Sequence, residues 1–161
     1  QNNTVLFCGM VKIKEFKMID FTKESQSRVL RVAEMRAEGQ KVCQEDIHIV
    51  GAMDIHPEFD EIWQEGELAC YPREIDGKVV NPFVHIVLHV RINRQIQNEE
   101  PYFVSIAHRR LTGQGSDPHE SLHAIISEYA DIYFETFRKG ESFDHLAYQV
   151  RIEALNYVKK D

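Results

Sequence analysis

The stretch NPFVHIVLHVRINRQIQN at residues 81–98 decides which fold this chain is expected to adopt. It begins with an asparagine that can cap a helix and a proline suited to the first helical position. His85, His89, Ile92 and Ile96 then follow at spacings of four, three and four residues. Because this spacing places the four side chains on one stripe, the stretch predicts a long helix whose histidines face the core.

A second helix of the same design is predicted after Asp117, which precedes a proline and can cap the helix start. His119 and His123 lie four residues apart near this start. Apolar residues continue their stripe toward Gly140, which is expected to end the helix. Two helices should therefore each turn a pair of histidines inward.

A third segment, residues 49–63, has the same spacing and carries His56 and Asp60. Its stripe is continuous only if the helix runs through Pro57 or merely kinks there, since proline disrupts a helix interior. Under that condition His56 and Asp60 also face the core and form a third pair of candidate ligands.

The rest of the chain adds helical patterns and no strand-like alternation that rivals them. Further helices are predicted at residues 23–38, 45–55, 102–111 and 143–158, with a turn-rich loop at residues 66–80. Five or six helices joined mostly by short links predict an all-α fold, an up-and-down helical bundle. We expect residues 18–161 to form this single domain, and residues 1–17 to be an extension or a disordered segment.

The composition excludes several classes of protein. The net charge is -7 and no cluster of Lys and Arg stands out, so polyanionic nucleic acid is not an expected partner. The longest apolar stretch, around residues 83–90, is far shorter than the roughly 20 residues of a membrane span. Three cysteines without a CxxC pair give no disulfide framework, which favours a cytoplasmic protein. The expected partner is an unidentified small molecule or protein.

The clustered inward histidines predict a metal site. A buried imidazole without a partner costs roughly 1 to 3 kcal/mol, and one metal ion offsets this cost for several of them. Imidazole with carboxylate suits iron, zinc or manganese better than calcium, and the set suffices for one ion or two. The predicted metal ligands are His85, His89, His119 and His123, with His56 and Asp60 as supporting candidates. The other histidines, predicted to lie at the surface, are His48, His108 and His145.

Residues 119–123 read HESLH and match the HExxH pattern, in which two histidines bind zinc and the glutamate is a general base. Glu120 also lies three residues after Asp117, where it can complete a capping box, and we favour this role over catalysis. Catalytic use of Glu120 would make the protein a zinc hydrolase. The same histidines could instead serve a non-enzymatic module for metal storage, sensing or interaction. They could also bind haem non-covalently, since the sequence has no CxxCH.

Three motifs together resemble the bacterial domain-of-unknown-function family 1841: HPEF at residues 56–59, NPFVHIVLH at residues 81–89 and HESLH at residues 119–123. The resemblance covers residues 21–155 and implies a small helical bacterial protein without an assigned activity. It also suggests a histidine at the position of Asp60, so the ligand set of this chain could differ from that of its relatives.

The paired histidines on neighbouring helices are similar in architecture to hemerythrin-like dimetal sites. That similarity implies redox or oxygen chemistry as one use of the metal. The leading prediction from the sequence is thus a metal-binding helical bundle with a histidine-rich core site, and redox or oxygen chemistry is one use that the similarity suggests.

Overall fold

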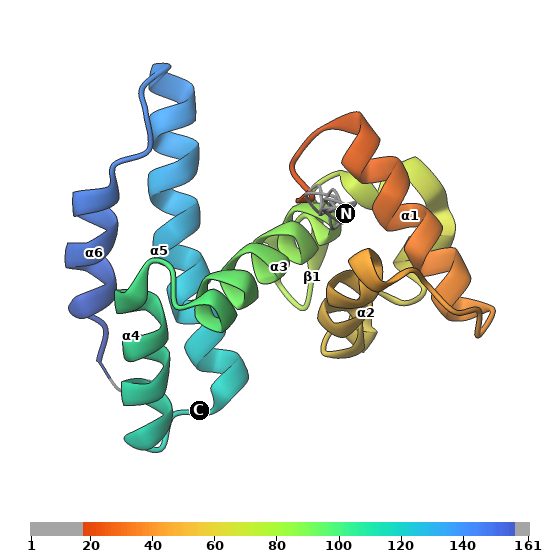
Figure 1. The fold of residues 1–161 in the computed structure, drawn as a ribbon. Coiled ribbons are helices and arrows are strands. Elements are labelled where there is room, and N and C mark those ends of the chain that lie inside the picture. The colour runs from red at the N-terminus through yellow and green to blue at the C-terminus, as the bar shows by residue number, and fades with distance from the viewer. Residues whose placement is uncertain (1–17, 157–161) are drawn as a thin grey trace, which may run out of the picture.

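The structure, a computed structural model, describes residues 18–156. These residues form six α-helices, three 3-10 segments and one hairpin of two strands (Figure 1). The elements in chain order are α1 (Lys23–Ala37), η1 (Gln44–Asp46), α2 (Ile47–Asp54), η2 (Pro57–Phe59), η3 (Ile62–Cys70), β1 (Arg73–Ile75), β2 (Lys78–Val80), α3 (Pro82–Asn98), α4 (Tyr102–Gly113), α5 (Pro118–Lys139) and α6 (His145–Glu153). The all-α prediction is confirmed, and the extension predicted for residues 1–17 lies outside the described residues.

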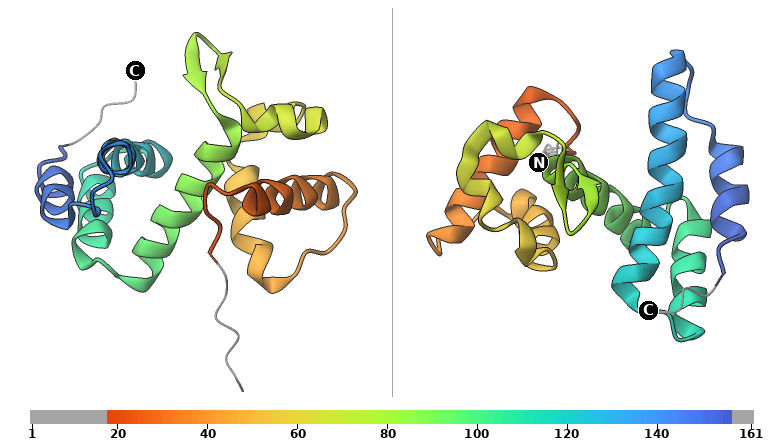
Figure 2. Two further views of the ribbon diagram at one scale, coloured as in Figure 1. Left: turned by 90° about the horizontal axis from the view of Figure 1, so that it is seen from above. Right: turned by 180° about the vertical axis from the view of Figure 1, so that it is seen from behind.

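Helix α3 runs through the middle of the molecule, as Figure 1 and Figure 2 show. It starts where predicted: the side chain of Asn81 accepts a hydrogen bond from the backbone N–H of Val84 at 3.1 Å, and Pro82 lies in the first turn. The amide of Asn81 also donates to the carbonyl of Cys70 at 2.8 Å, which ties the helix start to η3. The helix ends at Glu99, whose backbone is left-handed.

The N-terminal unit, residues 18–80, packs against the first half of α3. Helices α1 and α2 and segment η3 bury an apolar cluster together with α3, and this cluster includes Val29, Ile49, Trp63 and Phe83. The side chain of Thr22 caps α1 by accepting a hydrogen bond from the backbone N–H of Ser25. The first half of α3 thus forms one side of this apolar cluster.

The C-terminal unit, residues 102–156, packs against the second half of α3. Helices α4, α5 and α6 lie side by side and bury a second apolar cluster, which includes Ile92, Ile125 and Tyr148. The hydroxyl of Tyr148 donates a hydrogen bond to the Gln95 side chain of α3 at 2.6 Å. Two apolar clusters therefore flank α3.

The condition under which residues 49–63 would form one helical stripe is not met, whereas the helix predicted for residues 45–55 ends close to its expected boundary. Helix α2 ends at Asp54, and η2 begins at Pro57 after a break at His56, whose φ of -129° and ψ of 59° are not helical. The residue before a proline is disfavoured in the helical region because the proline ring clashes with its backbone. His56 therefore lies in a turn, and the helical spacing of this segment does not determine where its side chains point.

Two further boundaries differ from the prediction. Residues 66–80 are more ordered than a loop, because β1 and β2 pair antiparallel with Glu74 opposite Val79. The last helix is shorter than residues 143–158, since α6 is capped by Asp144 and ends at Glu153. Among the described residues, no helix combines the length and the apolar character needed to cross a membrane.

Candidate metal centre

The imidazole Nε2 atoms of five histidines converge where α3, α5 and the turn before η2 meet. His56 lies at the middle of the group, with its Nε2 atom 2.8 Å from that of His89, 3.1 Å from that of His85 and 3.2 Å from that of His119. The Nε2 atom of His123 lies 3.0 Å from that of His89. The structure thus brings together all five histidines that the sequence suggested as ligands.

Two helices position four of these rings by helical spacing alone. His85 and His89 lie one turn apart on α3, and His119 and His123 lie one turn apart at the start of α5. The start of α5 is held by Asp117, whose carboxylate accepts hydrogen bonds from two backbone N–H groups, of His119 at 3.0 Å and of Glu120 at 3.2 Å. Helix capping is therefore established for Asp117, and it fixes the turn that carries His119.

The fifth ring, that of His56, is positioned by packing and by a carboxylate. It is buried, stacks on Phe59 with ring centroids 5.1 Å apart, and places Nδ1 2.7 Å from Oε1 of Glu58. A carboxylate only accepts hydrogen bonds, so the proton of neutral His56 belongs on Nδ1 and its Nε2 lone pair faces the other histidines. Carboxylates orient metal-binding histidines in this way in many proteins.

Sequence reasoning missed Glu58. The available signal was its place two residues after His56 in the His-Pro-Glu motif, where a proline-initiated 3-10 turn folds the chain tightly. The stripe considered for this segment assumed helical geometry, in which residues two apart point to different faces, so the contact was not anticipated.

Asp60 is not part of the centre, which corrects the prediction. Its carboxylate accepts a hydrogen bond from Nη1 of Arg36 at 2.8 Å, and its side chain is 43% exposed. The physical reason is the break at His56, because the pairing of residues 56 and 60 required a helix that the proline interrupts. As far as the described residues show, the group that could hold an ion consists of four imidazoles, with that of His85 beside it, and contains no carboxylate.

Burial keeps three of the helical histidines, His85, His89 and His123, neutral. Desolvation, followed by the charges of the neighbouring histidines, lowers the pKa of His85 to about 3 and that of His89 to about 2. Desolvation and the nearby His119 lower the pKa of His123 to about 4, while the negative charge of Glu120 opposes this shift. Neutral imidazoles have a free lone pair on one ring nitrogen, which is the form that binds metals.

The remaining histidines lie outside the centre. His48 and His145 are exposed, in agreement with their prediction as surface residues. His108 differs, because it is half-buried and its Nε2 atom is shielded from solvent without a hydrogen-bond partner among the described residues.

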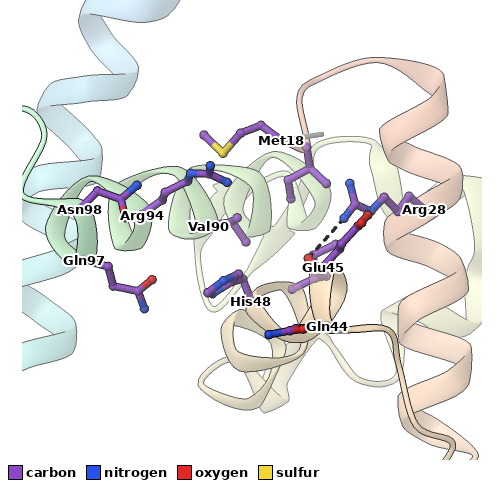
Figure 3. A pocket seen from close by; sticks show the side chains of 11 residues that line it. Met18, Arg28, Gln44, Glu45, His48, Val90, Arg94, Gln97 and Asn98 are labelled. Carbon is purple, nitrogen blue, oxygen red and sulfur yellow. Dashed lines mark hydrogen bonds between the residues drawn. The ribbon is translucent and has the colours of Figure 1, made fainter. Parts of the chain in front are cut away.

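A pocket of about 270 Å³ is lined partly by α3, the helix that carries His85 and His89, but it is separate from the centre (Figure 3). Its lining includes His48 of α2 and four residues of α3, Val90, Arg94, Gln97 and Asn98. Residue 90 is rotated by about 100° around α3 from residue 89, and the other three residues continue its stripe. None of the five converging histidines lines this pocket, so its chemistry is not that of the metal centre.

Comparison with known proteins identifies one family. Its model matches residues 23–154, a range that contains all five converging histidines, and its description is "Domain of unknown function (DUF1841)". No curated protein and no solved structure matches the chain. The family description states no activity, and the chemistry of the centre is therefore the basis for any function.

Proposed function

Because the chain belongs to the family of domain of unknown function 1841, whose description states no activity, we propose a function from the centre itself. The protein is a metalloprotein that holds one transition-metal ion between its converging histidines. Four of them, His56, His89, His119 and His123, offer ligand atoms that all lie within 4.8 Å of one another. His85 lies beside this group, next to His56.

The observation that carries this proposal is that hydrogen bonds cannot account for the convergence. Each neutral imidazole nitrogen has either one proton to donate or one lone pair to accept, so five Nε2 atoms form at most two well-directed hydrogen bonds among themselves. The centre has four Nε2 pairs at 2.8 to 3.2 Å. A cation that accepts all the lone pairs removes this conflict.

The spacing of the nitrogens suits ligands of a single ion. Histidine nitrogens bind metals at about 2.0 to 2.1 Å, so two of them lie about 3.0 Å apart when their bonds to the ion meet at right angles. The four Nε2 pairs are close to this separation. A dinuclear site usually draws on carboxylates as well, and Asp60 is turned away toward Arg36. We therefore favour one ion over two.

The ligand type narrows the choice of metal. Imidazole nitrogen suits iron, zinc, copper and nickel, whereas manganese prefers sites with more oxygen ligands. With Asp60 outside the centre, iron and zinc are better supported than manganese among the metals we expected from the sequence. Iron would supply redox or oxygen chemistry, and zinc would give a site for structure, storage or sensing. Binding of haem is disfavoured, because rings packed this closely leave no gap for a flat macrocycle.

A zinc hydrolase is the second candidate, and Glu120 is the residue that favours it. Both histidines of the HESLH motif that contains Glu120 lie in the centre, and the negative charge of Glu120 raises the pKa of His123. Hydrolytic zinc sites keep three protein ligands and a water molecule, however, and this centre offers more than three histidines. In zinc-loaded protein, E120Q should abolish ester hydrolysis at unchanged zinc content. No hydrolysis by the wild-type protein would exclude this candidate.

The test of the proposal is elemental analysis of tag-free protein, before and after reconstitution with ferrous iron or zinc, together with its visible spectrum. We expect about one equivalent of metal per chain, and its loss in H89A and H123A. H145A is the matched control, because His145 is an exposed histidine outside the centre. Reconstituted wild-type protein without bound metal, or unchanged metal content in both variants, would overturn the proposal.

A cytoplasmic location and an unidentified small-molecule or protein partner remain predictions from the sequence. Fractionation of cells of the native source, followed by detection of the chain in each fraction, would test the first. Nothing in the centre depends on either of them.

A further inference from the structure

The ligands of the centre come from three parts of the chain that are otherwise packed in two separate clusters. His56 belongs to the N-terminal unit, His119 and His123 belong to the C-terminal unit, and His85 and His89 lie on α3 between them. The N-terminal unit and the C-terminal unit each bury their own apolar cluster against α3. The centre therefore lies at the place where the two units meet.

Outside the centre, aromatic packing joins the two units directly. The ring of Phe21 lies 5.3 Å from that of Tyr133 and 5.4 Å from that of Phe134 on α5, and the guanidinium of Arg91 lies over Phe21 at 4.9 Å. Phe21 is only partly buried and packs on the edges of both apolar clusters. Both units also pack on α3, and the histidines of the centre bring His56 into contact with α5.

We infer that the metal ion is a cross-link between the two units, so that its binding couples their folding. This inference rests on the proposed function, because it assigns a second role to the same ion. With the ion bound, His56 is bonded through the metal to His119 and His123 on α5. Without it, the crowded Nε2 atoms retain at most two hydrogen bonds, and the N-terminal unit is held mainly by its own packing on α3.

Two kinds of unfolding follow from the two states. In the metal-free protein, each unit has its own cluster and a weak direct contact with the other, so the units should unfold in separate steps. Metal binding favours only the arrangement in which both units are folded and adjacent, so the loaded protein should unfold in a single step. Metal binding would then change the cooperativity with which the whole chain unfolds.

The experiment is scanning calorimetry of the full chain, loaded with zinc and after removal of metal by a chelator. The ratio of calorimetric to van't Hoff enthalpy should be about 1 for the loaded protein and clearly larger for the metal-free protein. Hydrogen exchange supplies the location: zinc should protect residues 55–60 and the first turns of α5 together.

The variant that isolates the cross-link is H56A. It keeps the four histidines of α3 and α5, so it should retain zinc at lower affinity while losing the link to the N-terminal unit. Zinc should then protect α5 but not residues 55–60, and unfolding should stay in two steps. H48A, a change at an exposed histidine of the same unit, should behave like the wild-type protein.

The outcomes separate this inference from the proposed function. Wild-type protein that binds neither zinc nor ferrous iron refutes both. Wild-type protein that binds zinc but unfolds with the same number of steps with and without it refutes the cross-link and leaves the metal site standing. The cross-link is also refuted if zinc-loaded H56A protects residues 55–60 as strongly as the wild-type protein does.

Discussion

The candidate metal centre draws its histidines from two kinds of segment, and these segments differ in how they hold a histidine. On α3 and α5, the helix itself places His85 and His89, and likewise His119 and His123, on one face. In the turn at residues 55–60, His56 is held by its stacking on Phe59 and by the carboxylate of Glu58. A regular element positions a ligand by its period alone, whereas a turn needs specific side-chain contacts for the same purpose.

The largest expected effect is from removing a ligand that a helix positions. H89A should lose the metal, because His89 is fully buried and its Nε2 atom lies close to those of His56 and His123. At a metal concentration 100 times the Kd, the loss of binding removes about 2.7 kcal/mol of stability. Thermal unfolding with and without zinc measures this, and metal should then no longer raise the Tm of the variant. A metal-dependent Tm that persists in H89A would contradict the assignment.

Acid should destabilise the metal-free protein, mainly through the helical histidines. The pKa values of His85, His89 and His123 are lowered to about 3, 2 and 4 by burial in the folded state, whereas in the unfolded chain they lie near 6.5. The unfolded state therefore binds more protons below about pH 6.5, and stability falls as the pH decreases from there toward about pH 4.

His56 is expected to contribute less to this acid effect. Burial lowers its pKa, but the hydrogen bond to Glu58 acts in the opposite direction. Denaturant titrations of chelator-treated protein between about pH 7 and about pH 4 should show the loss of stability. They should also show a weaker pH dependence in H89A than in H56A. Stability that is independent of pH over this range would contradict the burial of neutral histidines.

A smaller effect is expected from the contact that positions the turn histidine. E58Q should weaken zinc binding by about 10- to 100-fold, because the amide no longer holds the proton of His56 on Nδ1 as a carboxylate does. Competition with a chromogenic chelator measures the affinity. E61Q changes an exposed glutamate of the same segment and should leave the affinity unchanged. Equal affinities of E58Q and the wild-type protein would show that packing on Phe59 is sufficient.

The smallest effect is expected at Asp60. D60N should leave the metal content unchanged and cost less than about 1 kcal/mol, since it removes one exposed ion pair to Arg36, which retains Asp54 as a partner. Elemental analysis and denaturant unfolding are the measurements. Loss of metal in D60N would mean that the carboxylate reaches the centre in solution after all.

Most of the centre could be predicted from the sequence where the backbone is regular. Asn81 and Asp117 mark two helix starts through capping, and the spacing of four residues then places both histidine pairs on one face each. These rules depend on neighbouring residues only, so they apply before the fold is known. The all-α class and the inward direction of each pair followed from the same local patterns.

The wrong prediction for Asp60 and the missed contact of Glu58 both lie in the one histidine-bearing segment of the centre that is not a regular helix. Pro57 breaks the helix, so the predicted partner Asp60 points to Arg36 and the unpredicted Glu58 contacts His56. Once the period is lost, the direction of each side chain depends on which neighbours it packs against. Those neighbours come from distant parts of the chain, and their positions cannot be derived from the spacing of residues 49–63.

By itself, the sequence determined the helices, the two inward histidine pairs and the chemistry of the ligands, because helical period and side-chain type are local properties. Only the tertiary structure decided that His56 joins both pairs, that the candidate ligand group contains no carboxylate among residues 18–156, and that two apolar clusters share α3. These features depend on the packing of the N-terminal unit and the C-terminal unit on opposite halves of one helix, and such packing follows from the shapes of whole surfaces rather than from any single stretch of residues.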